Sequence, residues 1–423
     1  MRILLLNQAF YPDPVASAQH AADLALELVG QGHQVSVICS GQGYDDPDLK
    51  FPDQEVWRGI SIHRFTATRL GKSQRWRRAI DFGTAMLRYV TKLATFPHQN
   101  IVIAMSSPPL IAFIGALFTR LRGGQLVCWT LDLNPAEAIA AGWLTEGSPI
   151  TRILKAQARF AYATADRIVA LDSYMADQIR ALGVRGDRIT VIAPWAHDRS
   201  VQFDRRRRDE FRKEHGLLDK FVVMHSGNHS PCHPLDTLLE AAIQLRDEQQ
   251  IVFCFVGGGS KFRSVQDFAA RHLLTNVLCL PYQRFEDLSA SLSAADLHIV
   301  VMGDRYVGAV HPCKVYNILA LGIPFLYIGP SPSHVTDLLP LGDTEWAQIA
   351  RHGDVSAVVN AILSARNMSG VPFAQERETG ARFSQRALTP LMANLVLSVT
   401  AELSVERVAR TAPPDTRHQA RNH

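Results

Sequence analysis

Two successive series of short apolar runs, each run followed by a loop and a helical pattern, constrain the fold of this chain most. In the first half the runs are residues 3–6, 35–39, 101–104, 126–130, 166–171 and 190–192. In the second half they are residues 221–225, 251–256, 277–280, 297–302 and 324–328. Short buried strands that alternate with helices form parallel sheets with helices on both faces. The sequence therefore predicts an α/β protein with two parallel sheets.

The length of 423 residues favours two domains, because one hydrophobic core rarely serves so long a chain. The alternation is interrupted at Pro194-Trp195, and a run of arginines at 205–208 opens a charged helix whose arginines we expect on a solvated face. The expected parts are an N-terminal domain (1–195), a linker (196–216), a C-terminal domain (217–385), a helix that packs back on the N-terminal domain (386–405) and a disordered tail (406–423).

Charge and cysteine content narrow the class of protein. A net charge of +4 is too small to indicate nucleic acid, but it suits an anionic ligand or membrane surface. Six irregularly spaced cysteines favour a reducing cytosol over a disulfide framework. No apolar run approaches the ~20 residues that span a bilayer, and the first residues resemble a strand more than a secretory signal. We expect a cytoplasmic protein.

Basic and aromatic residues meet at Arg75, Trp76, Arg77 and Arg78, just ahead of an amphipathic pattern that continues to Phe96. Such a combination suits the headgroup layer of an anionic membrane. A helix with one solvated face explains the same pattern. The sequence leaves both interpretations open, and with the first we expect a peripheral contact with the cytoplasmic face of the inner membrane.

The stretch from Arg305 to Gly322 predicts a phosphate site. Gly308, Pro312 and Lys314 precede a helical pattern that ends at Gly322. Backbone N–H groups at a helix start lack partners within the helix and carry a partial positive charge, so they attract a phosphate or diphosphate. An ordinary connection between a strand and a helix would have the same pattern.

Three further loops follow predicted strands, where parallel sheets bind their ligands. Asp132 and Glu137 follow the run 126–130, and they suit either ligand contact or the start of a helix. Ala16 and Ser17 follow the first strand, where small residues admit a phosphate or sugar or allow tight helix packing. The glycines at 257–259 let the backbone approach a ligand, although glycines are also common in turns.

In order and spacing, these features resemble the GT-B glycosyltransferases, and among them the retaining family 4. The matching segments are 132–137 (Asp-Leu-x-Pro-x-Glu), 192–198, 226–228 (Ser-Gly-Asn), 257–259, 294–296 (Ala-Ala-Asp) and 312–322 (Pro-x-Lys-x-Tyr-x-Ile-Leu-Ala-x-Gly). The resemblance implies two Rossmann-like domains that face each other across a cleft, a UDP- or GDP-sugar donor and no metal cofactor. Within this family the sequence is similar to the subgroup of bacterial exopolysaccharide, O-antigen and colanic-acid transferases. This similarity implies a polyprenyl-linked saccharide acceptor.

The resemblance also implies roles for particular residues. Lys314 would neutralise the donor diphosphate, and Asp132 would face the transferred sugar or the acceptor hydroxyl, so these two are the expected catalytic residues. Acceptor contacts are expected at Ala16, Ser17 and Glu137. Donor contacts are expected at Gly227, Asn228, His229, Gly257, Gly258, Gly259, Arg284, Phe285, Gly308, Ala309, Val310, His311, Pro312, Cys313 and Asn317.

Two positions depart from the family pattern. The family usually has two glutamates separated by seven residues at the donor site, and Ala309 and Asn317 occupy those positions. Asn317 could still accept a hydrogen bond from the ribose through its amide oxygen. The missing acids leave open a protein that binds sugar nucleotides without turnover, and a sugar-nucleotide epimerase is a further alternative.

A zinc site is a third alternative, because His229, Cys232, His233, His311 and Cys313 could converge at one face. Their spacing does not match a standard zinc motif, so we expect no metal. The sequence identifies neither the donor base and sugar nor the acceptor.

Overall fold

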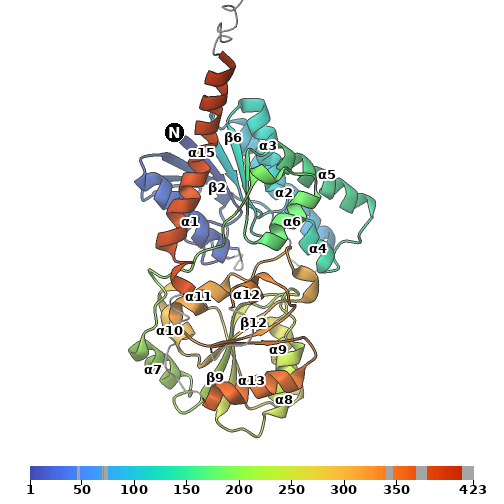
Figure 1. Cartoon of the computed structure of the whole chain (residues 1–423), viewed down its shortest axis with the longest axis vertical. Coiled ribbons are helices and arrows are strands. Elements are labelled where there is room, and N and C mark those ends of the chain that lie inside the picture. The colour runs from blue at the N-terminus through green and yellow to red at the C-terminus, as the bar shows by residue number, and fades with distance from the viewer. Residues whose placement is uncertain (45–47, 69, 71–74, 340–345, 368–378, 412–423) are drawn as a thin grey trace, which may run out of the picture.

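The computed structural model describes residues 1–44, 48–68, 70, 75–339, 346–367 and 379–411. Figure 1 shows two α/β domains, one above the other, with the last helix running along the upper, N-terminal domain. Among the described residues, no helix is both long and apolar enough to cross a membrane.

The N-terminal domain contains a sheet of eight strands in the order β3-β4-β2-β1-β5-β6-β7-β8, in which every neighbouring pair is parallel except β3 and β4. Its strands are β1 (Arg2–Leu6), β2 (Gln34–Ser40), β3 (Gln54–Trp57), β4 (Ile60–Phe65), β5 (Ile101–Ala104), β6 (Gln125–Trp129), β7 (Arg167–Ala170) and β8 (Ile189–Val191). The strand order reverses between β1 and β5, and a doubly wound sheet binds its ligand at such a switch point.

The C-terminal domain repeats this plan with six parallel strands in the order β11-β10-β9-β12-β13-β14. They are β9 (Phe221–Asn228), β10 (Ile251–Gly258), β11 (Val277–Leu280), β12 (Leu297–Val301), β13 (Phe325–Ile328) and β14 (Ala347–Ala350). The switch point lies between β9 and β12. The two segments that follow these strands therefore meet at the carboxyl edge of this sheet.

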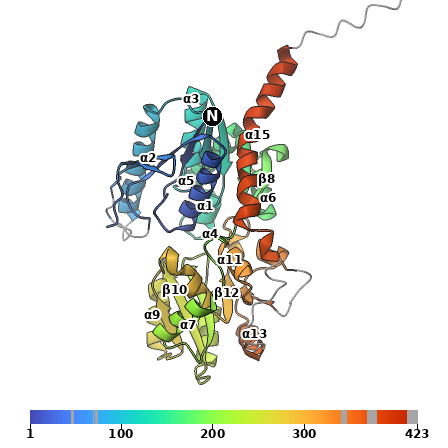
Figure 2. The same cartoon turned by 90° about the vertical axis from the view of Figure 1, so that its left-hand side faces the viewer.

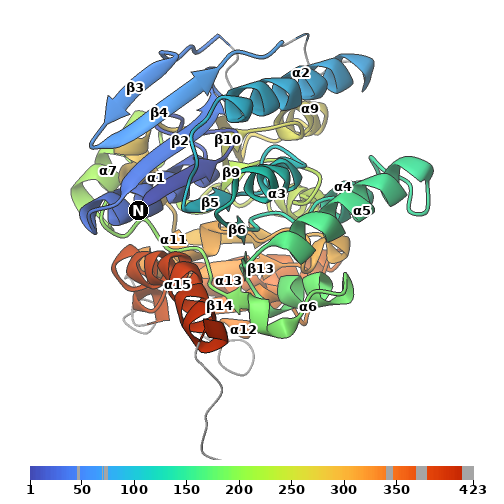
Figure 3. The same ribbon diagram turned by 90° about the horizontal axis from the view of Figure 1, so that it is seen from above.

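Helices cover both faces of each sheet. In the N-terminal domain they are α1 (Ala16–Gly30), α2 (Arg75–Ala94), α3 (Ile111–Arg122), α4 (Ala136–Ala140), α5 (Pro149–Thr164) and α6 (Ser173–Ala181). In and after the C-terminal domain they are α7 (Arg205–Glu214), α8 (Asp236–Gln244), α9 (Phe262–Arg271), α10 (Leu288–Ser293), α11 (Lys314–Leu321), α12 (His334–Asp337), α13 (Val355–Asn367) and α15 (Gln385–Thr411). Figure 3 shows α2, α3 and α5 on the side of the N-terminal domain away from α15.

The chain crosses between the domains twice, and the two crossings run side by side. Ala196 donates its N–H to the carbonyl of Phe383 at 2.7 Å, and Asp198 accepts the N–H of Gln385 at 2.7 Å. After the second crossing, α15 packs against α1, and Met392 and Val396 are buried in the core of the N-terminal domain. Figure 2 shows α15 along the full height of that domain.

The arginine run of α7 differs from the expectation of a solvated face. Arg212 is buried and Arg208 is largely buried, and each pairs with Asp296 at 2.5 Å. Asp296 also accepts the N–H of Val222 at 2.7 Å. Buried charges require such partners. The Ala-Ala-Asp segment therefore has a structural role, which is to hold α7 against β9 and the end of α10.

Two other expectations need correction. The sequence patterns did not predict β3, β4 or β14; β3 and β14 are short strands at sheet edges, and β4 is the neighbour of the edge strand β3. The helix α15 continues to Thr411, so residues 406–411, expected in a disordered tail, are helical. The segment 402–410 contains good helix formers and no proline. The rest of that predicted tail, residues 412–423, lies outside the described residues.

Candidate active site

The carboxyl edges of the two sheets face each other, and direct contacts join them. The N–H of Leu133, which follows β6, donates to the carbonyl of Ala309 at 2.8 Å. Gln178 of α6 donates to the carbonyl of Val307 at 2.7 Å. The loops that follow strands of both sheets therefore form the walls of one cleft between the domains.

Lys314 is the first residue of α11 and lies half-buried in this cleft. Its Nζ lies 3.1 Å from Nε2 of His225, near the end of β9. The other ring nitrogen of His225 lies 3.2 Å from the carbonyl oxygen of Ile299. If Nδ1 donates to that carbonyl, Nε2 has a free lone pair for the ammonium group. His225 thus positions Lys314, a role that the sequence patterns did not indicate.

Burial makes the charge of Lys314 sensitive to pH near neutrality. It lowers the pKa of Lys314 to about 7. Burial, followed by the charge of Lys314, lowers the pKa of His229 to about 4 and that of His233 to about 3. These imidazoles are neutral at pH 7. The positive charge at this point therefore comes from Lys314, and an incoming anion would favour its protonated form.

The glycine loops pack against each other. A Cβ at Gly257 would overlap the carbonyl oxygen of Gly227, and a Cβ at Gly259 would overlap the side-chain oxygen of Asn228. Both Gly257 and Gly259 have a positive φ, of 133° and 110°. The side chain of Lys314 passes over Gly227, where a Cβ would lie 3.4 Å from Nζ. Small residues are thus needed here for the two loops and the lysine to approach each other.

Asp132 and Glu137 lie on the opposite wall, after β6 and in the first turn of α4. The Oγ of Ser106 accepts the N–H of Asp132 at 3.0 Å and so holds the loop in place. Burial raises the pKa of Asp132 to about 6. Burial and the charge of Asp132 raise the pKa of Glu137 to about 8. At neutral pH this pair therefore retains a proton.

The charged groups of both walls lie within electrostatic range of one thiol. The pKa of Cys232 is raised to about 11, mainly by burial; the hydrogen bond with Ser230 lowers it, Asp132 and Glu137 raise it, and Lys314 lowers it. The hydrogen bond from Leu133 to Ala309 places the loop of Asp132 and Glu137 against the turn that leads to Lys314, so the carboxyl groups of one wall and the lysine of the other belong to the same part of the cleft. Such an arrangement can hold hydroxyl groups on one side and a diphosphate on the other.

The two positions that depart from the family pattern lie at the domain connections. Ala309 is buried, and its backbone carbonyl makes the contact with Leu133 described above. The Oδ1 of Asn317 accepts the N–H of His197 at 2.9 Å, in the first crossing. Its predicted contact with the ribose would have to use the second lone pair of this oxygen, or the amide N–H groups, and it stays a prediction.

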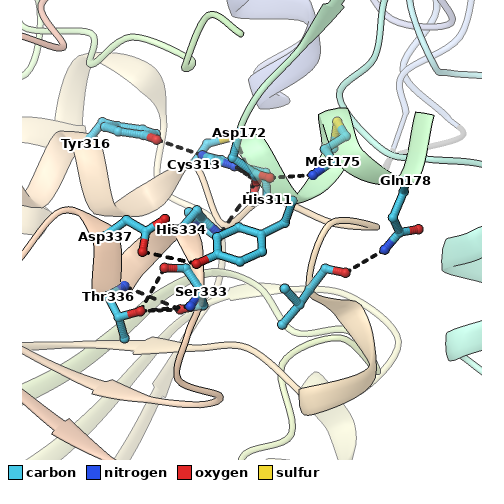
Figure 4. Close-up of polar contacts among 12 residues, drawn as sticks. Asp172, Met175, Gln178, His311, Cys313, Tyr316, Ser333, His334, Thr336 and Asp337 are labelled. Atoms are coloured by element: carbon cyan, nitrogen blue, oxygen red, sulfur yellow. Dashed lines mark hydrogen bonds and ion pairs between the residues drawn. The ribbon is translucent and has the colours of Figure 1, made fainter. Parts of the chain in front are cut away.

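His311 belongs to a polar cluster between the domains (Figure 4). One ring nitrogen lies 2.7 Å from the carboxylate of Asp172, and the other lies 2.7 Å from the hydroxyl of Tyr316. The ring of His334 stacks on that of His311 with centroids 3.8 Å apart. The sequence patterns missed Asp172 and His334, although Asp172 lies two residues after the end of β7 and caps α6 through Met175.

The other predicted donor residues are spread along the cleft. Phe285 begins a short 3-10 helix after β11, and its ring lies 6.2 Å from that of His197. Arg284 is exposed and pairs with Asp287 at 2.9 Å. Gly308 lies against the carbonyl of Tyr174 in α6, so a Cβ there would collide with the N-terminal domain. Gly308 therefore serves the contact between the domains.

The predicted acceptor and membrane residues lie in the N-terminal domain. Ala16 and Ser17 form the first turn of α1, after the loop that follows β1. Trp76 is exposed at the start of α2, and the guanidinium of Arg77 lies 5.4 Å from the centre of its ring. The side chains of Arg75 and Arg78 lie outside the described residues.

Two groups of described residues have ligand atoms close enough together for a metal ion, and neither is the group considered from the sequence. They are Asp172, His311 and His334, and the group of His20, Asp23 and His197. The imidazoles of His229 and His233 instead approach the carbonyls of Gly227 and Val301, at 3.0 and 2.6 Å. The absence of a metal cofactor stays a prediction.

Comparison with known proteins agrees with this architecture. The curated relatives include the putative colanic acid biosynthesis glycosyl transferase WcaI of Escherichia coli K12, 24% identical over 76% of this chain and 82% of its own length. The probable glycosyltransferase WbjE of Pseudomonas aeruginosa is 24% identical over 57% of this chain and 61% of its own length.

Solved structures share the whole fold. Sucrose-phosphate synthase from Thermosynechococcus elongatus has a TM-score of 0.72 at 15% identity, over 95% of this chain and all of the other. HepE from Anabaena, solved with UDP-glucose, has a TM-score of 0.64 at 16% identity, over 97% of this chain and all of the other.

Family models match both domains. The glycosyl transferase 4-like domain matches residues 16–195, and the glycosyl transferases group 1 model matches residues 207–333. The two matches lie on either side of the first crossing, and each contains most strands of one sheet. The chain therefore belongs to the GT-B glycosyltransferases of family 4.

Proposed function

We propose that this protein transfers a sugar from a nucleotide-sugar donor to a polyprenyl-linked saccharide acceptor, with retention of anomeric configuration, during the assembly of a bacterial surface polysaccharide. The names of WcaI and WbjE support the setting, and the UDP-glucose complex of HepE supports the class of donor. A hexose or N-acetylhexosamine is the proposed sugar.

The observation that carries this proposal is the contact between the two walls of the cleft, in which the N–H of Leu133 donates to the carbonyl of Ala309 and so places the loop of Asp132 beside the turn that leads to Lys314. Negative charge grows on the diphosphate as the bond between sugar and phosphate breaks. A lysine and fixed N–H dipoles aimed at that charge are expected to lower the barrier most. Asp132 would then orient the acceptor hydroxyl, which attacks from the face that the diphosphate leaves.

A panel of UDP- and GDP-sugars tests the proposal, with release of the nucleoside diphosphate measured in the presence of lipid-linked saccharides. Transfer with retention gives a product whose anomeric configuration, read by NMR, equals that of the donor. Nucleotide binding without turnover would favour the non-catalytic alternative, for which Ala309 and Asn317 are the motivating observation. Isomerised donor sugar would favour the epimerase.

We also propose that α2 contacts an anionic membrane surface. Leu87 and Val90 of this helix are exposed together with Trp76, and Arg77 and Arg88 lie among them. Exposed apolar residues beside cations suit an anionic headgroup layer. Co-sedimentation with anionic liposomes tests this. Binding that is indifferent to both salt and the substitution of these arginines would contradict it.

A further inference from the structure

A cavity of about 240 Å³ lies in the N-terminal domain between α3 and α5, above the carboxyl ends of β5 and β6. Its walls are mainly apolar, and they include Phe113 of α3 and Leu154 of α5. An apolar cavity of about 150 Å³ already admits a hydrocarbon as large as benzene. This cavity can therefore hold a larger apolar group.

The cavity adjoins the acceptor wall of the cleft. Asp132 and Ser106 belong to its lining, and the same Ser106 hydroxyl holds the Asp132 loop. Leu110 also lines the cavity and has a φ of +71°, a strained value for a residue other than glycine. A ligand here would thus have an apolar part between the helices and a polar part at Asp132.

The helices around the cavity, which lie on one side of the N-terminal domain (Figure 3), are rich in basic residues. The sequences of α2, α3 and α5 contain ten lysine and arginine residues and one acidic residue, Asp81. Their formal charge of +9 exceeds the +4 of the whole chain. Leu121, Ile150 and Ile153 are exposed on α3 and α5, at 83%, 63% and 59%. Basic and apolar residues together suit an anionic lipid surface, from which a lipid chain could enter.

We infer that the cavity between α3 and α5 binds the hydrocarbon chain of a glycolipid acceptor, and that Asp132 contacts the sugar attached to that chain. This inference rests on the proposed function, because it assigns the acceptor of the same site. The apolar walls recognise the chain, and the carboxylate accepts hydrogen bonds from sugar hydroxyls. The bound hydrocarbon chain thereby fixes which sugar hydroxyl lies opposite the donor.

Alkyl glucosides test the inference on the full-length protein. Affinities for methyl, hexyl and octyl glucoside are measured by calorimetry, all below the critical micelle concentration. Each methylene that enters the cavity should tighten binding by about fourfold. Ala158→Phe, which fills the cavity from α5, should abolish this dependence on chain length. Ala156→Phe, on the exposed side of the same helix, is the matched control and should leave it unchanged.

Ala112→Phe fills the cavity from α3 and provides a second variant if Ala158→Phe fails to fold. Binding that does not depend on chain length, or that persists in both cavity variants, would overturn the inference. UDP binding is measured in the same samples and separates the two claims. If UDP binds normally but the affinity for glucosides does not depend on the length of the alkyl chain, only the cavity assignment fails. If glucosides bind as expected and no nucleotide binds, the donor assignment fails instead.

Discussion

The carboxylate of Asp172 and the imidazole of His311 form a buried contact 2.7 Å long between the two domains. Asp172 follows β7 of the N-terminal domain, and His311 lies three residues before Lys314. The contact therefore joins the wall that contains Asp132 to the turn that contains Lys314. The other ring nitrogen of His311 lies 2.7 Å from the hydroxyl of Tyr316, so protein groups engage both nitrogens.

Asp172→Asn should loosen this connection between the domains. Asparagine at position 172 can still cap α6, so the change mainly replaces the charged carboxylate beside His311 by a neutral amide. A hydrogen bond to a charged group contributes about 1.5–3 kcal/mol, and we expect a lower Tm and a larger radius of gyration in small-angle scattering. Asp177→Asn, on the exposed side of α6, is the control. Identical Tm and scattering for the two variants would show that the contact does not hold the domains.

Lys314→Ala should slow sugar transfer by roughly 10²–10³-fold, the usual effect of removing one group that stabilises transition-state charge. The fold should survive, because the variant relieves the burial of a charge and leaves His225 with its carbonyl partner. Initial rates with the best donor from the panel measure the effect, and Lys213→Ala in α7 is an exposed control. Wild-type kcat/KM in Lys314→Ala would mean that the diphosphate binds elsewhere.

Nucleotide binding should take up protons at pH 8. Burial lowers the pKa of Lys314 to about 7, so most of the free protein has a neutral amine at this pH. The diphosphate, whose last ionisation lies near pH 6, is fully charged and raises that pKa. Calorimetry of UDP binding in buffers of different ionisation enthalpy counts the protons. Lys314→Met should lose this uptake, whereas uptake that persists in Lys314→Met would assign it to another group.

Sequence patterns predicted the two sheets and the helix that begins at Lys314 well, because buried strands and helix starts depend on local composition. Lys314 and Gly322 could be placed at the two ends of α11 for this reason. The connections between the domains could not be predicted in this way. The contact of Asp172 with His311 joins residues 139 positions apart, and no local pattern encodes such a pairing.

The same reason explains the errors at individual residues. Arg208 and Arg212 look like surface residues in a charged helix, and only the fold brings Asp296 to them. At the glycines 257–259 the fold adds a packing role that the sequence did not show, because Gly257 and Gly259 lie against the loop at Gly227 and Asn228, while their donor contact stays a prediction. His225 appears as the last residue of an apolar run, and its partner Lys314 is distant in sequence.

Gly257→Ala should destabilise the C-terminal domain strongly. A methyl group at this position would overlap the carbonyl of Gly227, and the φ of +133° is itself unfavourable for alanine. Gly216→Ala is the matched control, because its φ is +69° and no atom lies within 4 Å of the added Cβ. We expect about 1–2 kcal/mol for the control and roughly 3 kcal/mol or more for Gly257→Ala, from Tm measurements. Equal losses would show that the loops can separate without cost.

Glu137→Gln should stabilise the protein at pH 8 and have little effect at pH 4. Folding raises the pKa of Glu137 from 4.5 to about 8 and that of Asp132 from 3.8 to about 6. The folded state therefore holds protons that the unfolded chain has released, and stability falls as the pH rises from about 4 to about 8. Glutamine cannot ionise, so it removes most of that loss. Allowing for solvent screening, we expect a gain of about 1–2 kcal/mol at pH 8, or roughly 2–8 °C in Tm.

Glu146→Gln is the matched control for this change. Glu146 is exposed in the segment that follows α4, and its hydrogen bond to Lys155 lowers its pKa. A group whose folded pKa is lowered contributes stability above its unfolded pKa, so its removal cannot stabilise the protein at pH 8. A Tm at pH 8 that is no higher in Glu137→Gln than in Glu146→Gln would show that the two carboxyl groups do not share a buried, proton-retaining site at the acceptor wall.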